Sequence, residues 1–426
     1  MDRRQFVQFG AGLSVVSSGL AQAQSKSVTY VGWSQDEAAS KPTLTAMFDG
    51  YRKEQADVKL DVVGFPFGQM QQNVLLRLRS NQPLDVVQLT ERWLPQFATT
   101  GRMLDMNQVF GKATLEKQIS PEILKFGEFR GKQLGVPWTA ASIGMVANAK
   151  VMSDAGVTAP PQTIDAFLSA LRAIKRTQPQ AVPYALMTKN NNSLSPEFQT
   201  WLWTFGGSLF DSKGQVTVNS AAGVRALTFM TDLVREGLAA KDIDRPDARR
   251  MYAQNQTGFY NDAPLARGFA RNNSGKGTAF DSNVIAMATP VVRTGDTPRA
   301  FAWSHLLCMF GTGKAVPNAQ SPQAKFISHL AMNPGNQMQY FKEQGLFPVV
   351  GSALADLASD AYVSTWSKAA RSALRDEISF WPNSADLTSI LGEEVQSAML
   401  GQKTPQAAIE SMGKRMEAKI AELPKS

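Results

Sequence analysis

One cysteine–histidine pair and two carboxylates are the residues whose chemistry could support catalysis. Cys308 and His305 could form a nucleophile–base pair, but residues three apart on a strand point to opposite faces, which argues against it. Glu91 and Asp262 could serve as the carboxylates of a glycoside hydrolase, although nothing in the sequence places them at the required separation. Neither His305 nor His329 has a cysteine or histidine partner at metal-ligating spacing. We therefore expect structural histidines, no metal and no cofactor.

The N-terminal residues have the composition of an export signal. Residues 2–7 are basic, residues 9–20 are apolar, and Ala21-Gln22-Ala23 fits a small-x-small cleavage site. Arg3-Arg4 is typical of a twin-arginine signal, although a general secretory signal also tolerates two arginines. We predict a signal peptide over residues 1–24 and a soluble protein exported to the periplasm.

Composition excludes several classes of protein. The formal net charge is +8, but lysines and arginines are scattered among acids instead of clustered with aromatics, so we predict no nucleic-acid binding. No segment after the signal is apolar for long enough to cross a bilayer. Cys308 is the single cysteine, which excludes an internal disulfide, and roughly 400 mature residues favour two domains.

Hydrophobic periodicity predicts alternating strands and helices in the first part of the mature chain. Residues 28–33, 58–63 and 86–89 have strand patterns, and residues 44–53 and 70–79 have helical ones. This β-α-β-α-β order predicts an α/β domain with a mainly parallel sheet.

The remainder of the chain is predicted to be richer in helices. Gly131 to Pro137 indicates a tight turn, a short strand, a proline stop and a second strand. Thr163 and Ser220 are expected to cap helices, and Pro405 to begin the last one. The other predicted elements are strands near 182–187, 283–292 and 301–310 and helices near 198–205 and 322–332.

Aromatic and polar residues directly follow the first three predicted strands. Trp33, Gln35 and Glu37 follow the first strand, Phe67 follows the second, and Glu91-Arg92-Trp93 follow the third. Because ligands of α/β sheets bind at the carboxyl ends of the strands, we expect these side chains to line a cleft.

A series of motifs runs through almost the whole mature chain. They are Pro83-Leu84-Asp85-Val86-Val87, Gly101 to Met106, Gly131 to Pro137 with Asn148, Pro161 to Asp165, Gly206 to Asp211, Gly345 to Pro348, and Gly401 to Ala407. In this order they resemble family 1 of the extracellular solute-binding proteins, which contains the maltose- and glycerol-phosphate-binding proteins. Leu84 is inserted here, and Ala147 and Ile164 replace a usual tyrosine and tryptophan.

The resemblance implies an α/β fold of the two-lobed periplasmic-binding-protein type (type II-like), with the ligand cleft between the lobes. A hinge of three crossing segments is implied near residues 140–144, 283–287 and 311–316. It also implies a monomer that delivers a sugar or sugar-like solute to the membrane subunits of an ATP-driven (ABC) importer.

These crossings divide the mature chain into two discontinuous lobes. The N-terminal lobe would hold residues 25–140 and 286–312, and the C-terminal lobe residues 141–285 and 313–426.

A sugar cleft needs aromatic faces for the pyranose ring and carboxylates or amides for its hydroxyls. Further candidates are Trp138, Thr139, Asn190, Phe198, Trp201, Tyr260, Asn261, Asp262, Trp303 and Phe347. Phe198 and Trp201 would share one helix face, which assigns Trp203 to the core. Gly258 to Asp262 resemble a cleft-lining segment of the family, although the tryptophan that usually follows it is absent.

Three functions remain open. The first is capture of a sugar for an importer. The second is a binding protein for a phosphorylated or acidic solute such as a glycerol phosphate, suggested by the positive charge, Arg92 and Arg267. The third is a secreted carbohydrate-active enzyme that would depend on Glu91.

Overall fold

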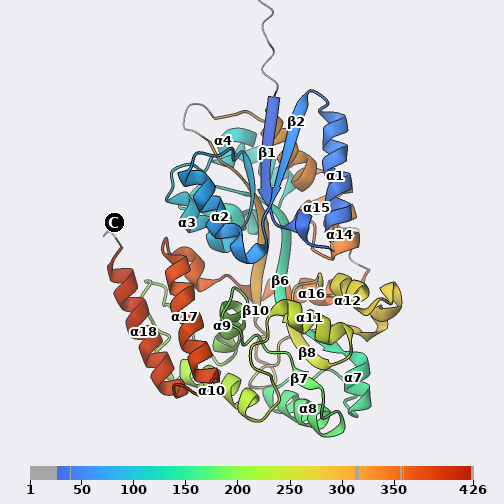
Figure 1. The fold of residues 1–426 in the computed structure, drawn as a ribbon, viewed down its shortest axis with the longest axis vertical. Helices are drawn as coiled ribbons and strands as arrows, with labels where there is room; N and C mark the ends of the chain where they lie inside the picture. The colour runs from blue at the N-terminus through green and yellow to red at the C-terminus, as the bar shows by residue number, and fades with distance from the viewer. Residues whose placement is uncertain (1–25, 39, 312–315, 356, 358, 424–426) are drawn as a thin grey trace, which may run out of the picture.

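Two α/β halves are joined by long strands in the structure (Figure 1). The computed structural model describes residues 26–38, 40–311, 316–355, 357 and 359–423, so the predicted signal peptide lies outside the described residues. In the first half, β1 (Lys26–Gly32) pairs in parallel with both β2 (Val58–Gly64) and β3 (Val86–Thr90), and α1 (Lys41–Glu54) and α2 (Phe67–Arg79) connect them. The predicted β-α-β-α-β order is confirmed, and so is the two-lobed α/β fold.

The second half combines short strands with most of the long helices. Its strands are β7 (Val182–Tyr184), β8 (Thr257–Asp262) and β9 (Val284–Met287). Its helices are α7 (Ala149–Asp154), α8 (Ile164–Thr177), α9 (Leu194–Thr204), α10 (Ala221–Arg235), α11 (Arg245–Ala253), α12 (Ala266–Ser274), α17 (Ser384–Met399) and α18 (Pro405–Ala421). The predicted caps are confirmed, because Thr163 accepts the N–H of Ala166 and Ser220 that of Gly223.

Short elements complete the chain. Between β3 and β6 lie η2 (Glu91–Trp93), α3 (Leu94–Ala98), α4 (Met106–Phe110), α5 (Lys112–Gln118), α6 (Pro121–Leu124), η3 (Lys125–Gly127), β4 (Glu128–Phe129) and β5 (Lys132–Gln133). The others are η1 (Ser34–Asp36), η4 (Gly277–Asn283), α13 (Pro322–Ile327), the π-helical η5 (Ser328–Met332), α14 (Pro334–Gln344), α15 (Gly351–Ala355), α16 (Ala361–Arg371), β11 (Ala373–Leu374) and η6 (Glu377–Phe380).

Strands β6 (Val136–Asn148) and β10 (Ala300–Met309) run through both halves. They are antiparallel to each other, and their paired residues run from Val136 opposite Leu307 to Ile143 opposite Phe301. From Gly144 onward β6 pairs instead with β8 and β9, whereas β10 pairs with β3 over His305 to Met309. One sheet, in the order β2-β1-β3-β10-β6-β8-β7, therefore connects the two halves.

The turn before β6 is confirmed, but the predicted proline stop is wrong. Arg130 and Gly131 both have positive φ, 49° and 74°, as the two-residue turn between β4 and β5 requires. Pro137 lies inside β6, beside a register shift opposite His305 and Leu306. The ladder is already interrupted there, so a residue without an N–H is tolerated.

Two predicted strands are shorter than expected, and the chain returns to the first half later than residues 283–287. The strand predicted over 283–292 ends at Met287, because Pro290 cannot donate to a ladder. That strand pairs with β6 inside the second half, so the chain returns through β10 instead. The strand predicted over 182–187 ends at Tyr184. Of the crossing predicted near 311–316, residues 312–315 lie outside the described chain.

The segment after β10 packs on the first half. Phe326 of α13 lies 5.4 Å from the ring of Tyr30 in β1 and 5.0 Å from that of Tyr51 in α1. The chain reaches α17 of the second half by way of α16, which contacts β6, β9 and β10. On these contacts we propose that residues 316–355 belong to the N-terminal lobe, whereas the sequence assigns 313–426 to the other lobe.

None of the described helices combines the length and the hydropathy that a membrane span requires. The core is divided between the halves: one large hydrophobic cluster packs around α8, α9, α10, α17 and α18, and another packs around β1, α1, α13 and α14. The sheet between these clusters carries the residues described next.

Replacing Gly144, where β6 changes partners, should destabilise the protein. A Cβ at this position would lie 2.9 Å from Cζ3 of Trp366 in α16, so Gly144→Val must displace a buried ring. We expect a loss of about 1–3 kcal/mol in the free energy of unfolding, measured by urea denaturation. Gly68→Ala in α2 is the control, because nothing lies within 4 Å of its Cβ position. Equal stability of the two variants would contradict this packing.

Candidate functional site

Four of the predicted cleft aromatics lie together at the carboxyl ends of the first strands. The ring of Phe67 meets Trp33 edge-on at 5.3 Å and stacks on Trp93 at 5.3 Å. Phe67 also stacks on Trp303 of β10, with ring centroids 6.1 Å apart. His305, two residues along β10, lies 4.9 Å from Trp33. Strand-end positions that are distant in sequence therefore form one aromatic cluster, in which Trp33 and Trp93 are buried.

Trp303 lies between two arginines from opposite halves. Cζ of Arg92, just after β3, is 5.8 Å from the centroid of the Trp303 ring, and so is Cζ of Arg245, the first residue of α11. Arg92 also donates from Nη1 to the backbone carbonyl of Asn192 in the second half, at 3.3 Å. Trp303 thus marks the place where the two halves meet.

The opposite wall of the site consists of the end of β8 with α9 and α11. Asp262 accepts from Nε and Nη2 of Arg249 at 2.7 and 2.9 Å, and its carboxylate is fully buried. Asn261 donates from Nδ2 to Oε1 of Glu197 at 2.9 Å. Because successive strand residues point to opposite faces, Asn261 and Asp262 present polar groups on both sides of β8.

Three carboxyl groups around the site have pKa values raised into the neutral range. Burial raises the pKa of Glu37, Glu91 and Glu197 from 4.5 to about 7 in each case. For Glu37, which follows β1, the positive charge of Arg249 opposes the rise in pKa and the negative charge of Asp262 adds to it. The loop after β1 therefore faces the ion pair on the second half.

Buried polar atoms without a hydrogen-bond partner gather at this junction. Among the described residues they include Thr90 Oγ1, Thr139 Oγ1, His305 Nε2, Trp303 Nε1, Glu197 Oε2, Asn261 Oδ1, the Tyr260 hydroxyl, and Nε and Nη2 of Arg245. Thr90, His305 and Thr139 lie directly opposite one another on three adjacent strands. Each such atom costs about 1–3 kcal/mol, and proteins rarely leave them unpaired. Their concentration indicates a place suited to hydrogen bonding with a polar molecule.

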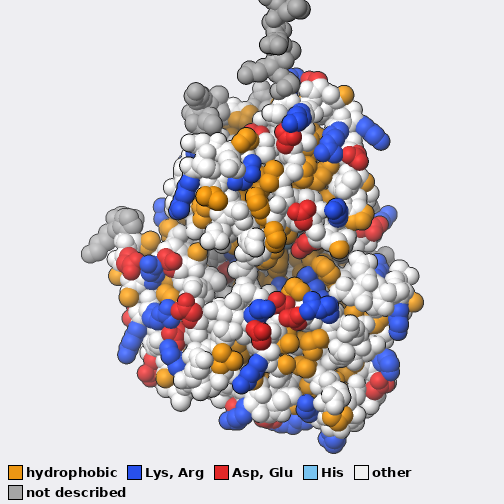
Figure 2. All heavy atoms as spheres, viewed as in Figure 1, with side chains coloured by type: hydrophobic (Ala, Val, Ile, Leu, Met, Phe, Trp, Pro, Cys, Tyr) orange, Lys and Arg blue, Asp and Glu red, His pale blue; other side chains and the backbone are white. Residues whose placement is uncertain are grey.

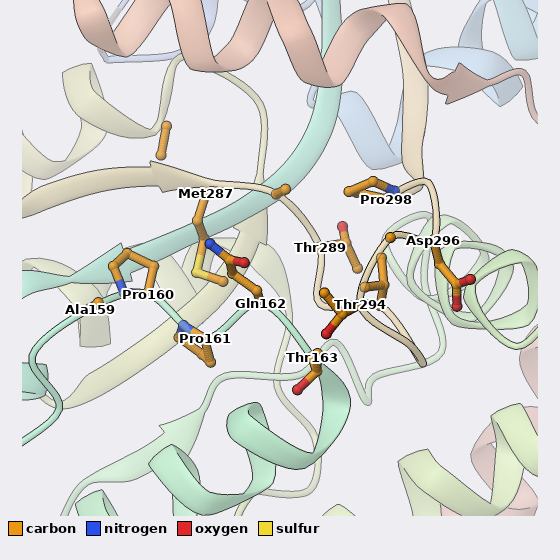
Figure 3. Close-up of a pocket in the computed structure, with 14 residues that line it drawn as sticks. Ala159, Pro160, Pro161, Gln162, Thr163, Met287, Thr289, Thr294, Asp296 and Pro298 are labelled. Carbon is orange, nitrogen blue, oxygen red and sulfur yellow. The ribbon is translucent and has the colours of Figure 1, made fainter.

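The surface is hollowed between the halves, with hydrophobic side chains inside the hollow and acidic and basic ones around it (Figure 2). A cavity of about 90 Å³ borders Arg92 and Trp93 of the first half and Asn192 and Asp376 of the second. A larger cavity of about 390 Å³ lies beyond the end of β9 (Figure 3). Its lining includes Pro160, Pro161, Met287 and Pro298, and of its described lining only Thr289 Oγ1 is a buried polar atom without a partner, so we favour the junction as the candidate.

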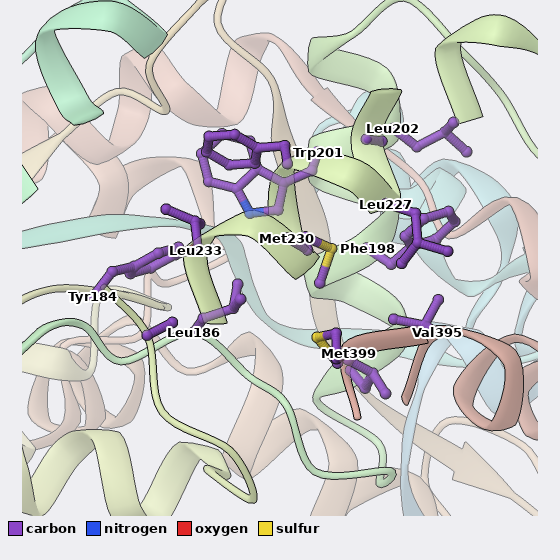
Figure 4. Packing of buried hydrophobic residues seen from close by; sticks show 14 of the residues in the cluster. Tyr184, Leu186, Phe198, Trp201, Leu202, Leu227, Met230, Leu233, Val395 and Met399 are labelled. Carbon is purple, nitrogen blue, oxygen red and sulfur yellow. The ribbon is translucent and has the colours of Figure 1, made fainter. Parts of the chain in front are cut away.

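Phe198 and Trp201 do not reach the junction, contrary to prediction. Both are fully buried in the hydrophobic core of the second half, among Leu202, Leu227 and Met230 (Figure 4). Helix α9 is buried along almost its whole length, so its spacing could not show which face meets the cleft. Trp203 is a core residue, as predicted: it is buried in a small hydrophobic cluster with Ile143 and Phe301 and stacks on Phe301 of β10 at 5.8 Å.

Other predicted site residues serve mainly to hold the structure. Trp138 stacks on Tyr340 at 4.9 Å within the first half, and Phe347 stacks on Phe341 at 6.0 Å. Gln35 donates from Nε2 to the carbonyls of Gly32 and Val63. Asn190 is exposed and lies against Gly392 of α17. Arg267, a candidate for an acidic ligand, is paired with Asp360 at 3.0 Å.

Glu197, Arg245 and Arg249 belong to the candidate site, although the sequence did not reveal them. One signal was available for Arg245, because Asp244 and Asp247 form a reciprocal capping box around it. That motif marks a helix start, but it does not indicate that the arginine turns inward. Glu197 and Arg249 lie on helices with no distinguishing local pattern.

Comparisons with known proteins all find solute-binding proteins. Residues 35–298 match the family described as bacterial extracellular solute-binding protein. The chain is 30% identical over 122 residues to the diacetylchitobiose binding protein DasA of Streptomyces coelicolor, covering 29% of this chain and 28% of that protein. It is 27% identical over 188 residues to an arabinooligosaccharide-binding protein of Halalkalibacterium halodurans, covering 42% and 39%. The matched regions therefore span less than half of the length of these relatives.

Solved structures share the fold over nearly the whole chain. The GacH receptor of Streptomyces glaucescens GLA.O, known unliganded and with acarbose, has a TM-score of 0.82 at 19% identity, covering 93% of this chain and 99% of that one. Maltose-bound T. maritima MalE3 has a TM-score of 0.80 at 18% identity, covering 92% and 99%. Because the sequence identities are this low, the similarity is evidence for a shared fold alone.

The raised pKa of Glu197 predicts a stability that falls as pH rises. The folded state binds the proton more tightly than the unfolded state, so the stabilisation is full below about pH 4.5 and is lost as pH rises to about 7. The free energy of unfolding of the unmodified protein should fall between pH 5 and pH 7.5. In Glu197→Gln this fall should be smaller by on the order of 1–3 kcal/mol, measured by urea denaturation at both pH values. Glu410→Gln on the outer helix α18 should leave the profile unchanged. A Glu197→Gln profile parallel to that of the unmodified protein would show that this carboxyl is not the titrating group.

Proposed function

Because the chain belongs to the bacterial extracellular solute-binding protein family, we propose that it captures a sugar between its two halves and delivers it to an ATP-driven importer in the membrane. The observation that carries this proposal is the set of unpaired buried polar atoms around Trp303, drawn from both halves. Hydroxyl groups both donate and accept, so one sugar could satisfy indole N–H, amide and carboxyl groups together. The relatives named for chitobiose and arabinooligosaccharide binding support the same class of ligand.

Capture requires motion of the halves and no chemical step. A ligand that contacts Trp303 and Arg92 on one side and Glu197 and Asn261 on the other binds the closed arrangement better than an open one. The ligand therefore shifts the equilibrium between the open and closed arrangements toward the closed one, by an amount set by its difference in affinity for the two arrangements. Strands β6 and β10 with the α16 segment would act as the hinge, since they connect the halves.

The geometry gives little support to an enzyme. Asp262 uses both carboxylate oxygens to bind Arg249, which leaves it poorly placed as an acid or base. Burial raises the pKa of the Cys308 thiol far above its usual range, so it would not form a nucleophilic thiolate. We propose a non-catalytic, periplasmic monomer that acts with the membrane subunits of the importer.

Trp303→Ala should weaken sugar binding. Purified protein, unfolded and refolded to remove any endogenous ligand, is titrated calorimetrically with a panel of mono- and oligosaccharides. We expect the unmodified protein to bind at least one sugar, and Trp303→Ala to lower that affinity by about tenfold or more, since it removes a buried aromatic surface and a donor.

Trp381→Ala is the matched control, because the Trp381 ring packs on Phe210 and does not line the junction cavity. It should bind the same sugar with unchanged affinity. Saturable binding without release of reducing ends supports the proposal. Failure of every sugar to bind, or equal affinity of Trp303→Ala and the unmodified protein, would refute it.

A further inference from the structure

Arg245 is the one arginine of α11 and α12 without an acidic partner among the described residues. Four of the five arginines in α11 and α12 form ion pairs with aspartates, namely Arg249 with Asp262, Arg250 with Asp247, Arg267 with Asp360 and Arg271 with Asp281. Arg245 is the fifth, and among the described residues no ion pair or hydrogen bond satisfies its Nε and Nη2. It is only 6% exposed, so solvent does not compensate for the missing partner.

The unpaired atoms form one edge of the guanidinium. Arg249 binds Asp262 through Nε and Nη2 at 2.7 and 2.9 Å, and Arg271 binds Asp281 through the same two atoms at 2.8 and 2.6 Å. This edge presents two parallel N–H groups, which match the two oxygens of a carboxylate. Two neighbouring arginines thus bind carboxylates through Nε and Nη2. In Arg245 the same two atoms are buried and have no partner.

From this geometry we propose that the captured sugar carries a carboxylate, as a uronic acid or an oligosaccharide of uronic acids does, and that Arg245 binds it in bidentate fashion. This inference rests on the proposed function. The neighbouring unpaired atoms fit the rest of such a ligand. Trp303 Nε1 can donate to an oxygen, and Asn261 Oδ1 can accept from a ring hydroxyl. Glu197 Oε2 can accept from a hydroxyl when ionised and donate to one when protonated.

The charges near Arg245 favour one negative charge on the ligand over two. Asp262 and Glu197 both lie close enough to Arg245 to influence its ionisation, and Arg249 and Arg92 do so with the opposite sign. Burial lowers the pKa of the Arg245 guanidinium, and a bound carboxylate would offset that cost. Arg249 is already neutralised by Asp262, so among the described residues Arg245 is the uncompensated cation on this wall, and Arg92 lies across Trp303 on the first half.

The test compares matched acidic and neutral sugars on the refolded full-length protein. Galacturonate and glucuronate, with their di- and trisaccharides, are titrated beside galactose, glucose and their neutral oligosaccharides, and beside glucose 6-phosphate. We expect the best uronate to bind about tenfold or more tightly than its neutral counterpart. Arg245→Gln should remove most of that preference while changing the affinity for the neutral sugar much less.

Two further variants separate a direct contact from a structural effect. Arg250→Gln, on the same helix but exposed, should keep the preference for uronate. Arg245→Lys keeps the charge without the planar edge and should restore only part of the preference. Melting temperatures without ligand check that each variant is folded.

The outcomes are distinguishable. Tight binding of neutral sugars with no preference for uronates would overturn this inference and leave the proposed function intact. Tighter binding of glucose 6-phosphate than of any uronate would replace the carboxylate with a phosphate and also overturn it. Failure of every sugar to bind would reject the proposed function and this inference together.

Discussion

The pairing of β6 with β10 is the constraint on which the rest of the structure depends. These two strands hydrogen-bond to each other across the junction, and each also belongs to the sheet of one half. A shift of one residue in their register would turn Trp303 to the opposite face. It would also break the alignment of Thr90, His305 and Thr139 on three adjacent strands. The ladder thus determines both the hinge and the composition of the site.

Around this ladder, several buried polar atoms of the described residues have no hydrogen-bond partner. Glu91 and Glu197 are almost fully buried, and burial raises the pKa of both carboxyls to about 7. The guanidinium of Arg245 is buried with one edge unpaired. A half-satisfied polar network is costlier than an apolar interior, so such an arrangement is expected where a ligand completes the network. The aromatic cluster of Trp33, Phe67, Trp93 and Trp303 supplies the apolar contact that a sugar ring would need.

Local patterns predicted the individual elements well and their partners poorly. Thr163 and Ser220 cap helices as expected, and Pro405 begins the last helix, because capping depends on neighbouring residues. Pro137 was expected to end a strand, but a register shift on the partner strand accommodates it. The segment with Phe326 was assigned to the second half, yet it packs on β1 and α1. Such pairings depend on distant residues and leave no local signal.

The sequence by itself determined the fold class, the order of strands and helices, and the strand-end positions of Trp33, Glu91, Arg92 and Trp93. These features follow from periodicity and from the rule that strand ends face the cleft. Tertiary structure decided which candidates reach the junction. It buried Phe198 and Trp201 in the core and turned Glu197, Arg245 and Arg249 into the site. The reason is physical: whether a helix residue meets the core or the cleft depends on how that helix packs against elements far away in the chain.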